Sequence, residues 1–274
     1  MKCKTFLVRL WAVLSFAATA GVIFFLFAYV FRGGAEAISW EFLTQSPKGA
    51  IIGTKGGIYP AIVGSACFTG IACLFAVILG ISAAIYQVYY CPSAKLAAAI
   101  SLVMRCMAGV PSIVMGLFGY SLLVLTLGWG KCVLAGGITQ GVMILPFIQV
   151  RAEKALREVD PALVKASYGL GMSRAYTIRR IILPQCLPQL VSGVILGACY
   201  AMGAAAPLIF TGAVIIAKAP KSLYKPAMAL PYHLYMLLTQ GTSAKNAYGT
   251  AFVMMMVVLV TNTLATWFAW RRKK

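Results

Sequence analysis

Long apolar stretches separated by short polar segments run through the whole chain, and this pattern predicts helices that cross a membrane. A helix needs about 20 apolar residues to span the hydrocarbon of a bilayer. Six charge-free stretches are long enough: Leu10–Phe31, Gly56–Ala94, Cys106–Gly130, Cys132–Val150, Ile181–Ala217 and Asn246–Trp270. The second and fifth exceed one crossing, so we expect each to include an extension or a turn outside the hydrocarbon. We therefore expect an all-α integral membrane protein with six transmembrane helices.

Two stretches have a second interpretation. The first could be a signal peptide, because basic residues precede it and Ala35–Ala37 resembles a cleavage site. Its apolar run has 22 residues, longer than the 7–15 typical of a signal peptide, so a retained anchor is predicted. The stretch Pro226–Ala244 is uncharged but has only a short apolar core, which is typical of a re-entrant or interfacial segment. Its His233, the only histidine, is expected at the polar rim.

Six crossings divide the basic residues into two alternating groups. One group holds the N-terminus, Lys95, Arg105, the segment Arg151–Arg180 and the tail Arg271–Lys274, and contains 16 basic residues. The other group contains the remaining 8 of the 24. Because the richer side of a membrane protein faces the cytoplasm, both termini are predicted to be cytoplasmic.

The polar segment 151–180 carries the signals of a helical hairpin. Asp160 is a typical N-cap, and Pro161 fits the first helical position. Gly169 and Gly171 are expected to end this helix.

After these glycines, Ser173 can cap a second helix, Arg174–Ile182, which would end before Leu183 and Pro184. The segment is therefore predicted to be a helix–turn–helix between two spans, on the cytoplasmic side.

The composition agrees with lipid as the main solvent. The chain has 274 residues, of which 61% are hydrophobic and 11% charged, whereas soluble domains carry about 25% charged residues. The net charge of +19 could attract nucleic acid, anionic lipid or an anionic substrate. The basic residues lie between apolar runs and not in one soluble module, so no nucleic-acid partner is predicted. Lys218, Lys221 and Lys225 form one predicted external patch, suited to an anion, an acidic binding protein or lipid headgroups.

Several kinds of chemistry are not supported by the sequence. No Ser–His–acid set and no His/Cys/carboxylate cluster with metal-ligand spacing is present, so no catalytic residue, metal or cofactor is predicted. None of the five carboxylates lies in a predicted span, which argues against a proton- or sodium-coupled carrier. There is also no G-x-x-x-x-G-K-[ST] phosphate loop, so energy for transport would have to come from another subunit.

One motif in the hairpin is specific. Lys165–Ser167 is followed after three residues by Gly171, and nine residues later by Ile181–Pro184. This spacing resembles the E-A-A-x3-G-x9-I-x-L-P loop of permease subunits in ATP-binding-cassette (ABC) importers. In that family, the short helix before the glycine inserts into a cleft on the ATPase. The resemblance implies a set of coupling residues: Lys165, Ala166, Ser167, Gly169, Gly171, Ile181, Leu183 and Pro184.

Three further stretches resemble phosphate importer permeases. Ala108–Gly119 looks like their third span, and Gly203–Gly212 looks like their G-E-T-A-P-L…T-G segment. Met228–Tyr235 looks like the M-A-L-P…Y/F segment of the A-type subunit rather than the C-type. The likeness covers residues 55–270. It implies a set of residues along the translocation path: Tyr200, Gly203, Ala204, Pro207 and Thr211.

The chain departs from the family pattern at three positions. Lys165 replaces the usual Glu of the loop, Ala204 replaces a Glu of the phosphate permeases, and Tyr200 replaces an Arg four residues earlier. In the family, this Arg and Glu are implicated in passing phosphate. Two alternatives to phosphate import therefore stay open: import of another oxyanion such as sulfate or molybdate, and a non-transporting membrane subunit that keeps the ATPase dock.

The sequence as a whole predicts two regions: an N-terminal transmembrane anchor with an external loop over residues 1–55, and an ABC permease domain over residues 56–274 that includes the coupling loop 151–180. The resemblance implies a multi-pass subunit of the cytoplasmic (inner) membrane that imports inorganic phosphate. It also implies ABC ATPase subunits, a second homologous permease and an external solute-binding protein as partners.

Overall fold

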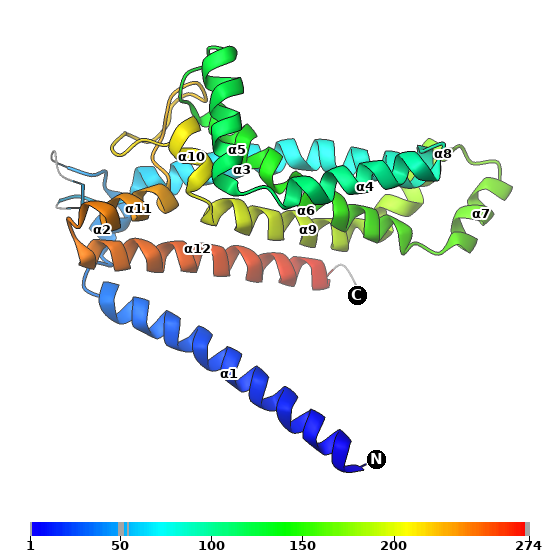
Figure 1. Cartoon of the computed structure of the whole chain (residues 1–274), viewed down its shortest axis with the longest axis horizontal. Coiled ribbons are helices and arrows are strands. Elements are labelled where there is room, and N and C mark those ends of the chain that lie inside the picture. The colour runs from blue at the N-terminus through cyan, green and yellow to red at the C-terminus, as the bar shows by residue number, and fades with distance from the viewer. Residues whose placement is uncertain (1, 49–51, 54, 272–274) are drawn as a thin grey trace.

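The computed structural model describes residues 2–48, 52–53 and 55–271, which form helices and connecting loops (Figure 1). The only β pairing within these residues is two isolated bridges, Lys48 with Lys55 and Ala213 with Ala227. In chain order the helices are α1 (Lys2–Gly34), α2 (Trp40–Thr44), α3 (Tyr59–Ile85), η1 (Tyr86–Tyr90), α4 (Ala94–Ala108), α5 (Ser112–Gly119), η2 (Tyr120–Thr126), α6 (Val133–Arg157), α7 (Pro161–Gly169), α8 (Arg174–Thr177), η3 (Ile178–Ile182), α9 (Leu183–Gly203), α10 (Ala206–Thr211), α11 (Leu230–Gln240) and α12 (Ala244–Arg271), where η denotes a π-helical turn.

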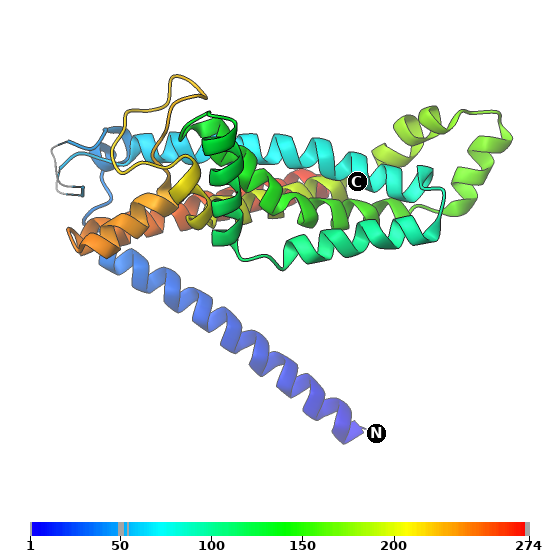
Figure 2. The same ribbon diagram turned by 45° about the horizontal axis from the view of Figure 1, so that its top comes forward.

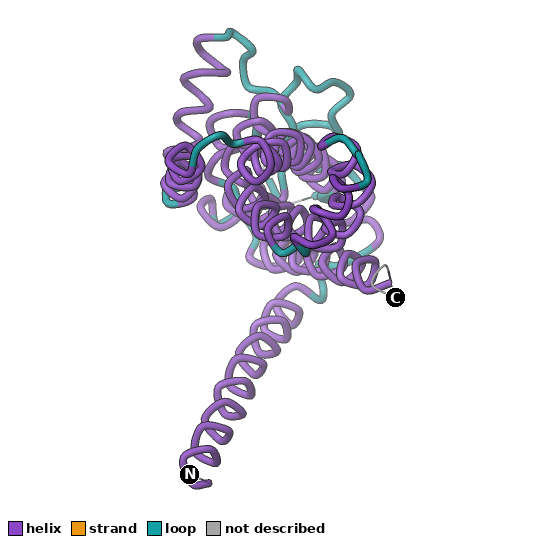
Figure 3. Tube along the Cα trace, turned by 90° about the vertical axis from the view of Figure 1, so that its right-hand side faces the viewer, coloured by secondary structure: helices purple, strands orange, loops and turns teal. Residues whose placement is uncertain are grey.

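The long helices α3, α6, α9 and α12 run side by side as one bundle, which Figure 3 shows end on. Helices α7 and α8 lie at one end of this bundle, called the α7 end, and α2 and α11 lie at the other, the α11 end (Figure 1). Five helical segments in the described residues are long and apolar enough to cross a membrane, and a bent pair of helices raises the number to six. The all-helical membrane fold predicted from the sequence is confirmed.

The third predicted span has a different form from the one expected. A single helix over Cys106–Gly130 is wrong: α4 already begins at Ala94, and the axes of α4 and of α5 with η2 differ by 99°. The break falls at Gly109–Pro111, because Gly109 ends α4 and Pro111 lacks the N–H that a continuous helix would need. Lys95 and Arg105, which the sequence places between two apolar stretches, are therefore part of a helix.

Close packing between α6 and α3 forms the centre of the bundle. Gly136, Gly137 and Gly141 lie on the face of α6 that meets α3, and a Cβ atom on Gly137 would come within 2.6 Å of the side chain of Ile71. Small residues of this kind let two membrane helices approach closely. Helix α6 is accordingly the most buried of the five apolar segments.

Helix α1 touches the bundle only near the α11 end. Its Gly33 and Gly34 lie against Tyr248 and Gly249 of α12, and the two helices then diverge (Figure 1, Figure 2). The remaining apolar surface of α1 is exposed within this single chain.

The expectation that His233 is a polar rim residue is wrong. Helix α11 has 11 residues, too short to cross a bilayer, and it packs against α12 and α3 with His233 only 3% exposed. Its Nδ1 has no hydrogen-bond partner among the described residues. Burial disfavours the charged imidazole and lowers the pKa of His233 to about 4.

Replacing Gly137 tests the close packing of α6 on α3. Gly137→Leu should force the two helices apart and lower the thermal unfolding midpoint of the purified protein in detergent, since overpacking costs about 1–3 kcal/mol. Gly70→Leu is the matched control, because a Cβ on Gly70 of α3 meets nothing within 4 Å. Equal midpoints for the two variants would contradict this packing.

The buried histidine predicts a pH dependence of stability. The folded-state pKa of about 4 lies below the unfolded value of about 6.5, so the unfolded chain binds a proton first as the pH falls. The stability contributed by neutral His233 is complete above pH 6.5 and is lost towards pH 4, by on the order of 3 kcal/mol. The unfolding midpoint should therefore fall less between pH 7 and 4.5 in His233→Gln than in the unchanged protein. If the unfolding midpoint depends on pH in the same way in both proteins, His233 is not the group that causes the loss of stability.

Candidate functional site: a helical loop and a broken helix

Local sequence signals build the first helix of the loop at the α7 end. Asp160 caps α7 by accepting a hydrogen bond from the backbone N–H of Ala162 at 2.8 Å, and Pro161 occupies the first turn. The helix ends at Gly169, and Gly171 adopts a positive φ of +78°, a left-handed conformation that glycine adopts without strain. These features match the sequence prediction residue by residue.

The second helix begins as expected but continues further. Ser173 accepts a hydrogen bond from the N–H of Tyr176 at 3.3 Å, which starts α8. The prediction that the helix ends before Leu183 is wrong, because the π-helical turn η3 carries the chain directly into α9. Pro184 fits near the start of α9 without breaking the helix, since a π turn changes the local hydrogen-bond pattern.

The base of the loop is fixed to three helices of the bundle. Ile182 and Leu156 are almost fully buried in a cluster contributed by α3, α6, η3 and α9. The Tyr89 hydroxyl donates a hydrogen bond to the carbonyl oxygen of Leu156 at 3.0 Å, and the Cys186 thiol donates to that of Ala155 at 3.2 Å. The base of the loop is therefore packed directly on α6 and α9.

The outer surface of the loop is apolar and basic. The large side chains of Leu170 and Tyr176 are 76% and 53% exposed, and Lys165 and Ala166 also face outward. Ser167 is instead buried, and its hydroxyl donates to the carbonyl oxygen of Leu163 at 2.8 Å. Exposed apolar residues that lie together on a polar loop are typical of a surface that binds another protein.

A second distinctive feature is the break between α9 and α10. Ala204 is extended there, with φ −88° and ψ 106°, and Pro207 starts the short helix α10. The side-chain amide of Gln140 on α6 donates hydrogen bonds to the carbonyl oxygens of Ala201 and Ala204, at 2.9 and 3.2 Å. These bonds satisfy the end of α9, while the Gln140 Oε1 has no partner among the described residues.

The predicted path residues are placed differently around this break. Tyr200 is half exposed, and its ring centroid lies 5.1 Å from that of Phe147; Gly203 is also exposed. Pro207 and Thr211 are buried, and the Thr211 hydroxyl donates to the carbonyl oxygen of Pro207 at 2.7 Å. Tyr200, Gly203 and Ala204 therefore share one partly open region, whereas the Thr211 hydroxyl is used inside the protein.

Gln140 and Ile182 are functional candidates that the motif resemblance does not include. Each has a sequence signal: Gln140 is an amide inside an apolar run, and polar groups within a span are costly unless they bind a partner. Ile182 directly follows the motif residue Ile181, which is only partly buried.

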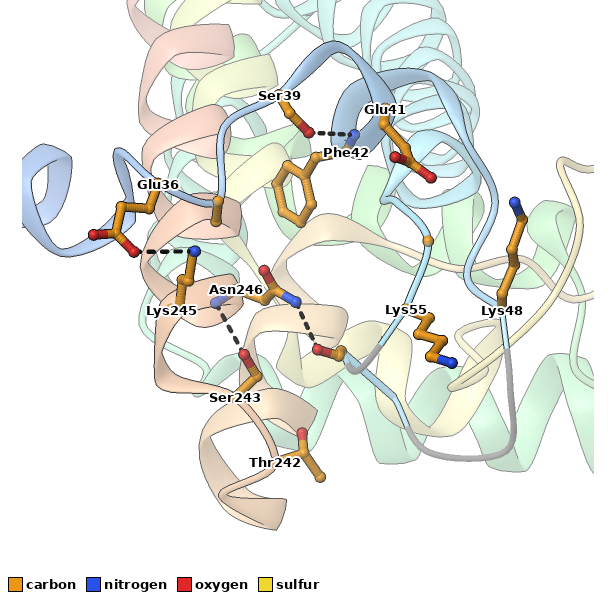
Figure 4. Close-up of a pocket in the computed structure, with 13 residues that line it drawn as sticks. Glu36, Ser39, Glu41, Phe42, Lys48, Lys55, Thr242, Ser243, Lys245 and Asn246 are labelled. Atoms are coloured by element: carbon orange, nitrogen blue, oxygen red, sulfur yellow. Dashed lines mark hydrogen bonds and ion pairs between the residues drawn. The ribbon is translucent and has the colours of Figure 1, made fainter.

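An open cleft lies elsewhere, at the α11 end, with a volume of about 730 Å³ (Figure 4). It carries charges of both signs, and the ammonium of Lys245 lies 3.1 Å from the carboxylate of Glu36. The amide of Asn246 donates to the carbonyl oxygen of Gly53 at 2.6 Å. No predicted path or coupling residue lines this cleft, so it is separate from both candidate sites.

Most of the chain matches a family of known transport proteins. Residues 76–272 match the family model of binding-protein-dependent transport system inner membrane components. The chain belongs to this family of ABC importer permeases.

Its relatives include phosphate permeases. The chain is 30% identical over 247 residues to the phosphate transport system permease protein PstA 1 of Mycobacterium tuberculosis, covering 89% of this chain and 81% of the relative. It is 29% identical over 266 residues to a probable ABC transporter permease, YqgI, of Bacillus subtilis, covering 92% and 90%.

Solved structures show the same fold at lower sequence identity. A structure of the inward-facing MetNI methionine ABC transporter aligns with a TM-score of 0.67 and 18% identity, covering 79% of this chain and 96% of that one. A bacterial alginate ABC transporter aligns with a TM-score of 0.67 and 16% identity, covering 97% and 96%. The chain therefore has the fold of type I ABC importer permeases.

Proposed function

We propose that this chain is the A-type permease subunit of an ATP-driven importer of inorganic phosphate. The observation that carries the proposal is the helical loop α7–α8, whose exposed apolar surface and left-handed glycine suit it to an ATPase cleft. The relatives named phosphate permeases, at about 30% identity over most of the chain, support phosphate as the substrate. The partners would be ABC ATPase subunits, a second homologous permease and an external solute-binding protein.

Uptake into reconstituted vesicles tests this function. The complex with its ATPase, second permease and binding protein should accumulate labelled phosphate only when ATP is present on the ATPase side. Preferred accumulation of sulfate or molybdate would replace phosphate as the substrate. If ATP causes no accumulation of any oxyanion, the second candidate, a non-transporting membrane subunit, is favoured. This candidate stays open because Tyr200 and Ala204 replace the family Arg and Glu.

Both termini of the chain are proposed to face the cytoplasm, on the basis of the 16-to-8 distribution of basic residues. In a Cys-depleted background, a cysteine introduced in place of Lys273 should react with a membrane-impermeant reagent only after the cells are opened. Labelling of this position in intact cells would reverse the proposed orientation.

Gly171→Arg tests the coupling loop. A side chain at φ +78° is strained, and the bulky charge would obstruct an ATPase cleft, so co-purification of the ATPase should fall at least tenfold while membrane insertion is unchanged. Gly128→Arg is the matched control, because Gly128 has φ +67° and also has open space around it, but lies outside the loop. Normal ATPase binding by Gly171→Arg would mean that this loop is not the dock.

Tyr200→Phe tests the path at the broken helix. The change removes one half-exposed hydroxyl and no charge, so phosphate uptake should fall only modestly, by about two- to fivefold. Neutralising the Arg at the matching position of the second permease should abolish uptake, because an anion in a low-dielectric path needs a compensating charge. Abolished uptake in Tyr200→Phe together with normal uptake in the partner variant would contradict this asymmetric path.

A further inference from the structure

A lysine outside the predicted path is attached to the broken helix. Lys131 lies between η2 and α6, and its ammonium donates a hydrogen bond to the carbonyl oxygen of Ile209 at 3.1 Å. Ile209 belongs to α10, the six-residue helix that follows the break at Ala204. Ile209 is the fourth residue of α10, so the Lys131 ammonium is held within one helical turn of Ala206, the first residue of that helix.

The Lys131 ammonium is free to bind a second group. An ammonium has three hydrogen-bond donors, and Ile209 uses one of them. The residue is exposed, and none of the salt bridges found in the described residues involves it.

Three further lysines lie on the loop that packs beside Lys131. The N–H of Val133 donates to the carbonyl oxygen of Lys225 at 3.0 Å, which holds the loop 213–229 against the start of α6. Figures 1 and 2 both show this loop next to η2. Lys218, Lys221 and Lys225 on the loop are all exposed. We call Lys131 and these three residues the lysine cluster.

No carboxylate of the described chain balances this cluster. Glu153, Glu158 and Asp160 belong to the α7 end, and Glu36 is paired with Lys245. Glu41 lies on the wall of the cleft at the α11 end, in which no member of the lysine cluster takes part. A surface with charges of one sign concentrates ions of the opposite sign and accelerates their association by roughly 10- to 1,000-fold.

We propose that the lysine cluster is an anion-recruiting site at the mouth of the translocation path, and that Lys131 contacts the oxyanion directly. The proposal rests on the proposed function and specifies how this chain handles an anion although Tyr200 and Ala204 replace the family Arg and Glu. The ligand class is a small, multiply charged oxyanion, and inorganic phosphate is the probe. The cluster acts before the path, so it is compatible with an essential cation on the second permease.

The competing interpretation is that Lys131 only caps the C-terminal carbonyls of α10, as lysines near helix ends often do. Three variants separate the two roles. Lys131→Gln keeps a hydrogen-bond donor but removes the charge, Lys131→Arg keeps both, and Lys131→Met removes both. Lys48→Gln is the matched control, because Lys48 is another exposed lysine that lies in the cleft at the α11 end and not in the cluster.

The measurement uses the assembled complex with a cysteine at Tyr224, a 66% exposed position between Lys221 and Lys225, in a Cys-depleted background. The ratio of reaction rates with an anionic and a cationic thiol reagent reports the local potential. Lys131→Gln and Lys131→Met should each lower this ratio roughly three- to tenfold at low ionic strength, whereas Lys131→Arg and Lys48→Gln should not. Phosphate should slow the anionic reagent more than chloride at equal ionic strength, and this difference should vanish in Lys131→Gln.

Three results would overturn the proposal: a ratio unchanged by Lys131→Gln, an effect confined to Lys131→Met, or equal protection by phosphate and chloride. An effect confined to Lys131→Met would leave helix capping as the role of Lys131. Equal protection by the two anions would favour lipid headgroups or an acidic protein as the partner of the cluster. The ratio of reaction rates does not depend on transport, so it tests anion binding by the lysine cluster even if the complex fails to import phosphate. A failure of import would be detected separately, by vesicle uptake.

Discussion

The close contact between the glycine face of α6 and the side chains of α3 is the interaction on which the rest of the structure depends. It places α6 in the centre of the bundle, where its two ends take part in both candidate sites. Near one end, Gln140 holds the break between α9 and α10, and at the other Leu156 is buried beneath the helical loop. A shift of α6 would therefore displace residues at both sites.

Helix α9 provides a second connection between the same two sites. The π turn η3 makes α8 and α9 continuous, so one helical path runs from Ser173 to the break after Gly203. The cluster around Ile182 and Cys186 fastens this path to α6 and α3. Force applied to the loop by an ATPase would therefore reach the break through two packed helices without a flexible intermediate, as expected for tightly packed elements that move as bodies.

The sequence predicts the elements that depend on local signals and misses those that depend on distant contacts. The Asp160 cap and the glycines after α7 are local, and the structure contains both as expected. The helix that continues through Leu183 and Pro184 is not predicted, because Pro184 indicates a helix end locally, whereas in the structure Ile178 and Ile182 of the π turn are buried against residues distant in sequence. The burial of His233 likewise comes from neighbours distant in sequence.

The candidate path shows the same division. Motif resemblance selects Tyr200 and Ala204, but the roles of Gln140 and Lys131 follow from hydrogen bonds that join residues 61–78 positions apart. Periodicity and spacing carry no information about such bonds. The bend at Gly109–Pro111 is partly predictable. Gly109 and Pro111 are helix-breaking residues in the sequence, but the length of the apolar stretch alone favours a single straight span.

The coupling of the two sites is tested most directly by the distance between the helical loop and the break in the proposed complex with an ATPase. Spin labels at Tyr176 on α8 and at Gly203, both exposed, can be followed by double electron–electron resonance in the assembled complex, with and without vanadate-trapped nucleotide. If loop and break move as one body, this distance should change by less than about 2 Å, the scale of small helix shifts, while the distance from Gly203 to the second permease changes by more. A change of several ångströms between Tyr176 and Gly203 within one chain would contradict rigid coupling.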